Sequence, residues 1–284
     1  MPNIGLVLSG GMVKGAYQIG ALQAINEIFS PSDICYASAA SVGALNTYAY
    51  LTQGLTKGVE LWSTINSNNN RRFIATLLKN CFLQDAIGKI ITDTNVDNIF
   101  YVPLVNLKKR TLLYVDIGKV SPENVELYLR ASVAMPAFNS GVEINGNRFY
   151  DGAMIDNIPI YPILKHQLDY VICIYFDKYN YTFESNYLDN KVIKVNFTDS
   201  KIVSSSICFT SESIKCMIGE GYAKTKRILD FIFVNGTSDL PGIYARIEDL
   251  NAMNTNRSLR ITGDILVDNM NKITKKFMKK TTIH

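Results

Sequence analysis

Histidine is nearly absent from this chain, which has only two histidines in 284 residues, His166 and His284. His284 is the last residue, and the ends of a chain are usually poorly ordered. His166 lies in the segment IYPILKHQLDY, which we expect to form a short helix. Any reaction that needs an imidazole as its base therefore depends on His166 alone.

Long apolar runs and a strong excess of one charge are also missing. No stretch approaches the roughly 20 apolar residues of a membrane-spanning helix, and the N-terminal segment MPNIGLVLSGG does not have the form of a signal peptide. The net charge is +4, from 29 Lys and Arg against 25 Asp and Glu, which does not suggest a nucleic-acid binder. We expect a cytoplasmic protein that, if it meets lipid at all, does so from the membrane surface.

The cysteines do not form a recognisable framework. The chain has five cysteines: Cys35, Cys81, Cys173, Cys208 and Cys216. Their number is odd, and their spacings match neither a zinc site nor a set of disulfides. We interpret them as reduced structural thiols, and we expect no bound metal ion and no organic cofactor.

The composition is that of a globular protein, with 47% hydrophobic and 19% charged residues. A short apolar strand, a small-residue turn and a helix follow one another twice in the first 50 residues. The predicted strands are Asn3–Leu8 and Ile34–Ala40, and the predicted helices are Gly15–Phe29 and Val42–Tyr50. This order predicts α/β architecture with a mostly parallel sheet, in a single domain over residues 1–284.

Further elements are expected along the rest of the chain. The region Lys57–Thr94 has a helical pattern interrupted by the polar run Asn66–Arg72, and Asn145-Gly146 is a strong hairpin turn signal. We predict strands at Leu112–Ile117, Tyr170–Phe176 and Lys191–Phe197, a hairpin at Val142–Tyr150, and helices after Ser121, within Ser206–Phe233 and from Asp264 onward.

The first candidate functional segment is the glycine-rich loop Ser9–Gly15, between a predicted strand and helix. Glycines allow a sharp turn that exposes successive N–H groups at a helix N-terminus, where negative charge is favoured. The loop contains neither the G-K-[ST] of a phosphate-binding loop nor the G-x-G-x-x-G of a dinucleotide site. A nucleotide-binding module is therefore disfavoured, while a purely structural turn remains an alternative.

The second segment is Ala39-Ala40-Ser41-Val42-Gly43, which has the form small-x-Ser-x-Gly between a strand and a helix. This form is typical of a nucleophile elbow, which exposes a serine hydroxyl at the end of a helix dipole. Serine is also a common helix cap, so Ser41 could instead serve only to cap the following helix. The third segment is Phe149–Ala153 followed by Asp156–Ile160. Its Asp151 leaves the end of a predicted strand, and it could equally be an ordinary turn residue.

Taken together, these segments resemble the patatin-like phospholipase family. Gly10–Gly15 is similar to the family's G-G-G-x-[KR]-G loop, Ala39–Gly43 to its G-x-S-x-G elbow, and Asp151–Ala153 to its D-G-[GA] triplet. Ala131–Phe138 is similar to the helix-ending A-S-x-A-x-P-x-x-F segment. The resemblance covers about residues 4–175, and residues 176–284 are expected to complete the sheet and helices.

The resemblance implies a three-layer α/β/α fold and hydrolysis of an acyl ester in a phospholipid or lysophospholipid. Its dyad would be Ser41 as nucleophile and Asp151 as base, without histidine. The resemblance also assigns an oxyanion hole to the N–H groups of Gly10, Gly11 and Met12. Lys14, Gly43 and Gly152 would support this site.

Two departures from the family pattern keep an alternative open. Met12 stands at the third glycine of the loop, and Ala39 stands at the first glycine of the elbow. A non-glycine residue forced into a left-handed conformation costs about 1–2 kcal/mol. The alternative is a catalytically weak relative that binds lipid or a partner protein.

The C-terminal tail, residues 264–284, has an apolar stripe and a basic face. Leu266, Met270, Ile273 and Phe277 fall on one side of a predicted helix, and lysines occupy other positions: Lys272, Lys275, Lys276, Lys279 and Lys280. This pattern is typical of an interfacial helix that binds anionic lipid. It is equally typical of an amphipathic helix packed on its own domain.

Overall fold

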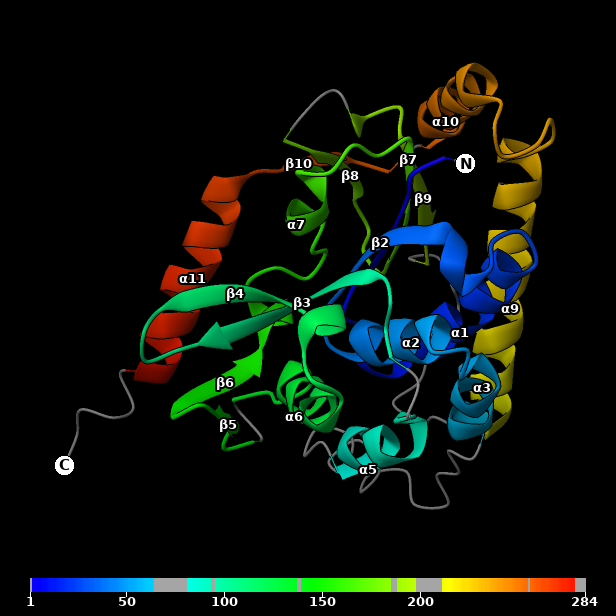
Figure 1. Cartoon of the computed structure of the whole chain (residues 1–284). Coiled ribbons are helices and arrows are strands. Elements are labelled where there is room, and N and C mark those ends of the chain that lie inside the picture. The colour runs from blue at the N-terminus through cyan, green and yellow to red at the C-terminus, as the bar shows by residue number, and fades with distance from the viewer. Residues whose placement is uncertain are drawn as a thin grey trace.

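A twisted, mostly parallel sheet forms the centre of the molecule (Figure 1). The structure, a computed structural model, describes residues 2–63, 81–92, 95–136, 139–184, 188–197, 211–254 and 256–278. Within these residues the sheet has eight strands in the order β5-β6-β3-β2-β1-β7-β9, with β4 also paired to β3. The strands are β1 (Ile4–Leu8), β2 (Ile34–Ala39), β3 (Ile99–Asn106), β4 (Thr111–Asp116), β5 (Val142–Ile144), β6 (Asn147–Asp151), β7 (Tyr170–Tyr175) and β9 (Val192–Asn196).

The strands β3, β2, β1, β7 and β9 run parallel to one another. The strands β4, β5 and β6 are antiparallel additions at the β3 side of the sheet. Side chains alternate along β1, where Leu6 and Leu8 enter one core and Val7 enters the other. Because both faces of the sheet are buried, its strands read as continuous apolar runs.

Helices cover both faces, which confirms the predicted three-layer α/β/α fold. The larger core includes buried residues of α1 (Gly15–Asn26), α2 (Val42–Leu51), α3 (Leu55–Ser63), α5 (Cys81–Ile90), α6 (Pro122–Ser132), α9 (Ser211–Ile232) and α10 (Leu240–Met253). The opposite core includes α7 (Tyr161–Leu164) and the small parallel pair β8 (Asn180–Phe183) and β10 (Ser258–Ile261). Short 3-10 turns are η1 (Met12–Lys14), η2 (Pro31–Asp33), η3 (Ile117–Lys119) and η4 (Gly152–Met154).

Several elements differ from the sequence prediction. The structure adds β3 in the middle of the sheet, the helix α10 and the β8–β10 pair, none of which we predicted. The Asn145-Gly146 hairpin is present, with both residues at positive φ (50° and 71°), as a tight two-residue turn requires. The polar run Asn66–Arg72 lies outside the described residues.

The tail helix α11 (Gly263–Met278) packs on the domain. Four of its apolar residues cover a small core made by Val105, Leu107 and Ile155, at the side of the sheet where β4 and β6 lie (Figure 1). These four are Leu266, Met270, Ile273 and Phe277. The basic residues Lys272, Lys275 and Lys276 are exposed, while Lys279 and Lys280 lie outside the described residues. None of the helices described is long and apolar enough to cross a membrane.

Candidate active site

Ser41 lies at a sharp turn between β2 and α2. Its backbone has φ 54° and ψ −131°, a conformation rare for residues other than glycine, and its side chain is almost buried, with 7% exposure. The turn needs small neighbours, because a Cβ on Gly43 would lie 2.7 Å from the Ser9 carbonyl oxygen. Ala39 fits at the end of β2 and is fully buried. The turn therefore has the strained strand–helix geometry of a nucleophile elbow.

The register of β3 brings Asp151 to this turn. Tyr101 of β3 pairs with Ser38 of β2, and Leu104 of β3 pairs with Asp151 of β6. Leu104 lies three residues beyond Tyr101, and Ser41 lies three residues beyond Ser38. Asp151 and Ser41 therefore meet beside the far end of β3.

Asp151 is buried and forms a hydrogen-bond contact with the Ser41 hydroxyl. Its Oδ1 also accepts the Ala153 N–H at 2.8 Å. Burial raises the pKa of Asp151 to about 7, although these two hydrogen bonds oppose the rise. A carboxyl group that titrates near neutral pH is a much stronger proton acceptor than a free aspartate.

The next residue, Gly152, must be glycine because it packs directly against the backbone of β3. A Cβ at this position would collide with the carbonyl group of Pro103 in β3. The triplet Asp151–Ala153 therefore turns tightly against β3, and this turn lets Ala153 hydrogen-bond back to Asp151.

The glycine-rich loop approaches the Ser41 turn from the end of β1. A Cβ on Gly10 would lie 3.1 Å from the Ser41 Cβ and 2.7 Å from Asn157 Oδ1. A Cβ on Gly11 would lie 2.5 Å from the Phe176 ring, and the Lys14 ammonium stands 5.8 Å from the same ring's centroid. A larger residue at either point would have to displace the Asn157 or Phe176 side chain.

The N–H groups of the loop differ in their partners. The Gly10 N–H donates to the Asn157 carbonyl at 3.3 Å. Gly11 and Met12 precede and begin the 3-10 turn η1, and no hydrogen bond from either N–H is recorded within the described part of the chain. Their position at the start of a helical turn leaves these N–H groups available for an anion.

Met12 adopts the left-handed conformation, with φ 52°. This is the conformation in which a Cβ is unfavourable by about 1–2 kcal/mol. The substitution of methionine at this glycine position therefore introduces backbone strain into the loop.

A buried polar network holds the glycine-rich loop from behind. Gln18 Nε2 donates to the Ser9 carbonyl at 2.7 Å, and Asn46 Nδ2 donates to the Gly15 carbonyl at 3.0 Å and to Gln18 Oε1 at 2.9 Å. The Trp62 indole donates to Asn46 Oδ1 at 3.1 Å. The network ties the loop to α1, α2 and α3.

His166 lies on the opposite face of the sheet, directly after α7. Its ring stacks on Tyr36 with centroids 4.0 Å apart, and its Nε2 is 3.5 Å from the Tyr101 hydroxyl. Burial, the largest cause, and Lys165 lower the pKa of His166. None of the contacts recorded for this histidine in the described chain reaches Ser41 or Asp151.

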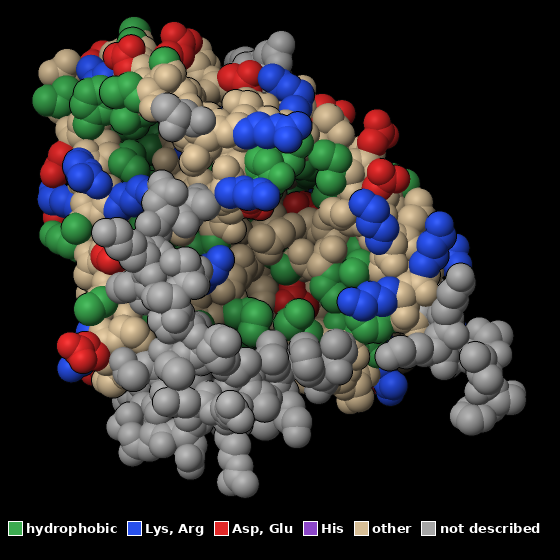
Figure 2. Space-filling view, turned by 180° about the vertical axis from the view of Figure 1, so that it is seen from behind, with side chains coloured by type: hydrophobic (Ala, Val, Ile, Leu, Met, Phe, Trp, Pro, Cys, Tyr) green, Lys and Arg blue, Asp and Glu red, His purple; other side chains and the backbone are tan. Residues whose placement is uncertain are grey.

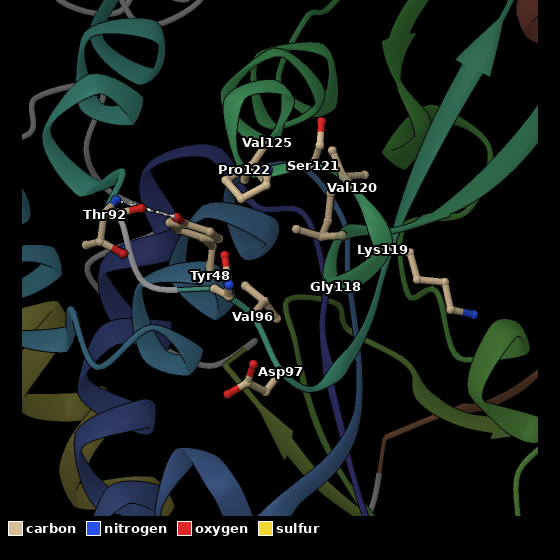
Figure 3. A pocket seen from close by; sticks show the side chains of 12 residues that line it. Tyr48, Thr92, Val96, Asp97, Gly118, Lys119, Val120, Ser121, Pro122 and Val125 are labelled. Carbon is tan, nitrogen blue, oxygen red and sulfur yellow. Dashed lines mark hydrogen bonds between the residues drawn. The ribbon is translucent and has the colours of Figure 1, made fainter.

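Two pockets near α2 differ in character. A pocket of about 440 Å³ lies at the far end of α2 from Ser41. In this pocket Tyr48 faces Thr92, and Val96 and Lys119 are among the other lining residues (Figure 3). A small apolar cavity of about 10 Å³, roughly the size of one water molecule, begins next to Ser41 between α2, α3 and α5. It is lined by Val42, Leu45, Asn46, Ala49, Gly58, Leu61, Trp62, Leu83 and Ile90. Only the apolar pocket includes the residue next to Ser41.

Comparison with known proteins identifies this arrangement. A family model described as patatin-like phospholipase matches residues 6–164, more than half of the chain. The chain belongs to the patatin-like phospholipase family. Curated sequences named lysophospholipase NTE1, from two strains of Cryptococcus neoformans var. neoformans serotype D, are 27% identical over 185 residues. The match covers 61% of this chain but only 11% of those proteins.

Among solved structures, VipD from Legionella pneumophila matches with a TM-score of 0.48 and 14% identity, over 98% of this chain and 75% of that one. The family model supports lipid acyl hydrolysis as the general kind of activity for this patatin-like chain.

Sequence reasoning missed several residues around the patatin-like site. Gln18, Asn46 and Trp62 act through contacts between separate elements, so no local motif marks them. Asn157, which accepts the Gly10 N–H, follows a second buried aspartate, Asp156. The sequence singles out the segment that contains both residues, Asp156–Ile160, but gives neither of them a role.

Proposed function

We propose that this protein hydrolyses the acyl ester of a phospholipid or lysophospholipid through a Ser41–Asp151 dyad. The observation that carries the proposal is the contact of the Ser41 hydroxyl with a buried carboxyl group whose pKa is raised to about 7. A serine hydroxyl needs an adjacent base to become a nucleophile. Asp151 is the base that its position offers.

In the proposed reaction, the Asp151 carboxylate takes the proton of Ser41 as Oγ attacks the ester carbonyl carbon. The resulting tetrahedral oxyanion collapses to an acyl-enzyme, and the leaving alcohol takes the proton back from Asp151. Asp151 then accepts a proton from water, which attacks the acyl-enzyme. Collapse releases the fatty acid and returns the proton to Ser41, so the dyad is unchanged after one turnover.

The oxyanion is proposed to bind the N–H groups of Gly11 and Met12. The N–H of Gly10, the third member of the expected set, is directed at Asn157, so we assign Gly10 the role of bringing the loop close to Ser41. Lys14 adds positive charge beside the loop, with its ammonium over Phe176. Removal of one oxyanion donor typically costs about 10²–10³-fold in rate.

The acyl chain of the substrate is proposed to enter between α2, α3 and α5, where the apolar side chains must move apart because the cavity there measures only about 10 Å³. Val42, which follows Ser41, and Leu45 belong to its wall. The opposite wall contributes Leu83 and Ile90 of α5. An apolar wall that begins next to the nucleophile suits a fatty acyl chain better than a polar acid.

Contact with an anionic membrane is proposed through the exposed lysines of α11. The apolar face of this helix is occupied by the domain, so we propose electrostatic attachment without insertion of that face. Basic side chains are spread along the side on which α11 lies, at the right of Figure 2. Each such charge contributes on the order of 1 kcal/mol near an anionic surface.

The test is hydrolysis of a lysophospholipid and labelling by a fluorophosphonate, each with the wild type and Ser41→Ala. We expect labelling and fatty acid release from the wild type and neither from Ser41→Ala. Matched circular dichroism would show that the variant is folded. Hydrolysis that persists in the purified variant would refute Ser41 as the nucleophile.

A catalytically weak, lipid-binding relative is the second candidate, and the left-handed φ of Met12 favours it. A strained residue at an oxyanion position can misdirect its N–H group. This candidate predicts binding of lipid vesicles with no fluorophosphonate labelling of the wild type.

A further inference from the structure

Asp156 is a second buried carboxyl group, five residues after Asp151, and the proposed chemistry does not use it. It is 2% exposed and accepts a 2.5 Å hydrogen bond from the Tyr114 hydroxyl. Burial raises the pKa of Asp156 to about 6, while the bond from Tyr114 and the Ile158 N–H oppose the rise. A buried carboxyl group held this closely by an element 42 residues away in sequence has a defined position.

The segment that carries Asp156 is a compact turn that begins at Gly152. The N–H groups of Ile155 and Asp156 both donate to the Gly152 carbonyl, at 2.9 and 3.0 Å. Asp151 stands at the start of this turn, and the Tyr114–Asp156 bond fixes its end. The turn therefore has little freedom at either side.

The next residue, Asn157, touches the glycine-rich loop. Its carbonyl accepts the Gly10 N–H at 3.3 Å, and its Oδ1 lies against the Gly10 Cα, because an added Cβ would be 2.7 Å away. The position of Asn157 therefore sets the position of Gly10, and with it the N–H groups of Gly11 and Met12 that follow.

We propose that Tyr114 and Asp156 form a positioning pair that sets the glycine-rich loop against Ser41 and Asp151. Tyr114 lies in β4, opposite Pro103 of β3, and belongs to the core on the other face of the sheet. The pair holds the turn from which Asn157 reaches Gly10. The expected effect of this pair on catalysis rests on the proposed function. Its effect on the position of the glycine-rich loop does not.

Tyr114→Phe tests the pair by removing one hydroxyl group and no carbon. We expect kcat for a soluble ester to fall about 10-fold with KM changed by less than about 2-fold, because small displacements of a reacting geometry are costly. Hydrogen exchange at residues 9–14 and 152–157 should become faster. The matched control is Tyr181→Phe, which breaks another 2.5 Å tyrosine–aspartate bond, to Asp177, and should leave kcat unchanged.

A double variant separates positioning from general destabilisation. If the pair acts as a unit, Tyr114→Phe with Asp156→Asn loses no more kcat than the worse single variant. Additive losses, or equal losses of kcat in Tyr114→Phe and Tyr181→Phe, would overturn the proposal. Raised KM with unchanged kcat would also overturn it.

Hydrogen exchange keeps this inference distinct from the proposed function. If the wild type hydrolyses no lipid and takes no fluorophosphonate, the dyad mechanism fails. Faster exchange at residues 9–14 in Tyr114→Phe, but not in Tyr181→Phe, would still support the positioning pair. Unchanged exchange at residues 9–14 would refute it in either case.

Discussion

Ser41 and Met12 both adopt a left-handed backbone without being glycine, yet the two sites differ in what the strain achieves. Their φ angles are 54° and 52°. At Ser41 the strained turn brings a hydroxyl group to Asp151, so the proposed chemistry depends on the side chain that causes the strain. At Met12 only the N–H group has a proposed role, and glycine would supply the same group. In the proposed mechanism, backbone strain accompanies a catalytic role at Ser41, whereas at Met12 it only lowers stability.

Ser41→Gly and Ser41→Ala give the largest expected effects and test the first half of this comparison. Both should lower lipid hydrolysis by at least about 10³-fold, because the nucleophile is lost. Ser41→Gly should be more stable than Ser41→Ala by about 1 kcal/mol in denaturant unfolding, because glycine tolerates the left-handed backbone. Equal stability of the two variants would show that Ser41 is not strained.

The pH dependence of hydrolysis tests the partner of Ser41. Asp151 must be ionised to accept a proton, so kcat should rise with pH through about 7, where its raised pKa lies. Met12→Gly should change the height of this profile without moving its midpoint. A midpoint near 4, typical of an exposed aspartate, would contradict the burial argument.

The same shift predicts the effect of Asp151→Asn on stability. Because the folded pKa of Asp151 lies above the unfolded value of about 3.9, its contribution to stability is present below pH 4 and is lost as pH rises to about 7. Asn cannot ionise, so Asp151→Asn should gain stability relative to the wild type between pH 4 and 8 while being inactive. Thermal unfolding of both proteins across this range measures the difference.

Met12→Gly tests the second half of the comparison and should have a moderate effect. We expect kcat to rise by a few-fold and the free energy of unfolding to rise by up to about 1 kcal/mol, since relief of strain exceeds the entropy cost of glycine. The measurements are steady-state hydrolysis and urea unfolding. A lower kcat in the glycine variant would show that methionine serves the loop.

The smallest effect is expected at the exposed lysines of α11. Replacing Lys272, Lys275 and Lys276 by Gln should weaken binding to anionic vesicles, more at low salt than at high salt. Hydrolysis of a soluble ester should not change. The substitution is preferable to truncation, because deletion after Asn271 would also remove Ile273 and Phe277 from the core under the helix. Binding that is unaffected at low salt would exclude this surface.

The sequence predicted the three-layer fold and brought Ser41 and Asp151 to attention because each lies in a short local motif at the end of a strand. It did not reveal β3, the strand that aligns them, because Pro103 interrupts its pattern and proline is unusual in an interior strand. The Tyr114–Asp156 bond and the Gln18–Asn46–Trp62 network were equally hidden. Each joins residues that are distant in sequence, so only the folded chain brings them together.

Trp62 is the one tryptophan in the sequence, and it is 2% exposed. Its indole donates to Asn46, and Asn46 in turn holds Gly15 at the end of the glycine-rich loop. Intrinsic fluorescence excited where tyrosine does not absorb would therefore come from a single point behind the proposed oxyanion hole. Movement of the loop during acylation or lipid binding should change the wavelength or intensity of this emission. The protein therefore contains its own fluorescent reporter and needs no added label.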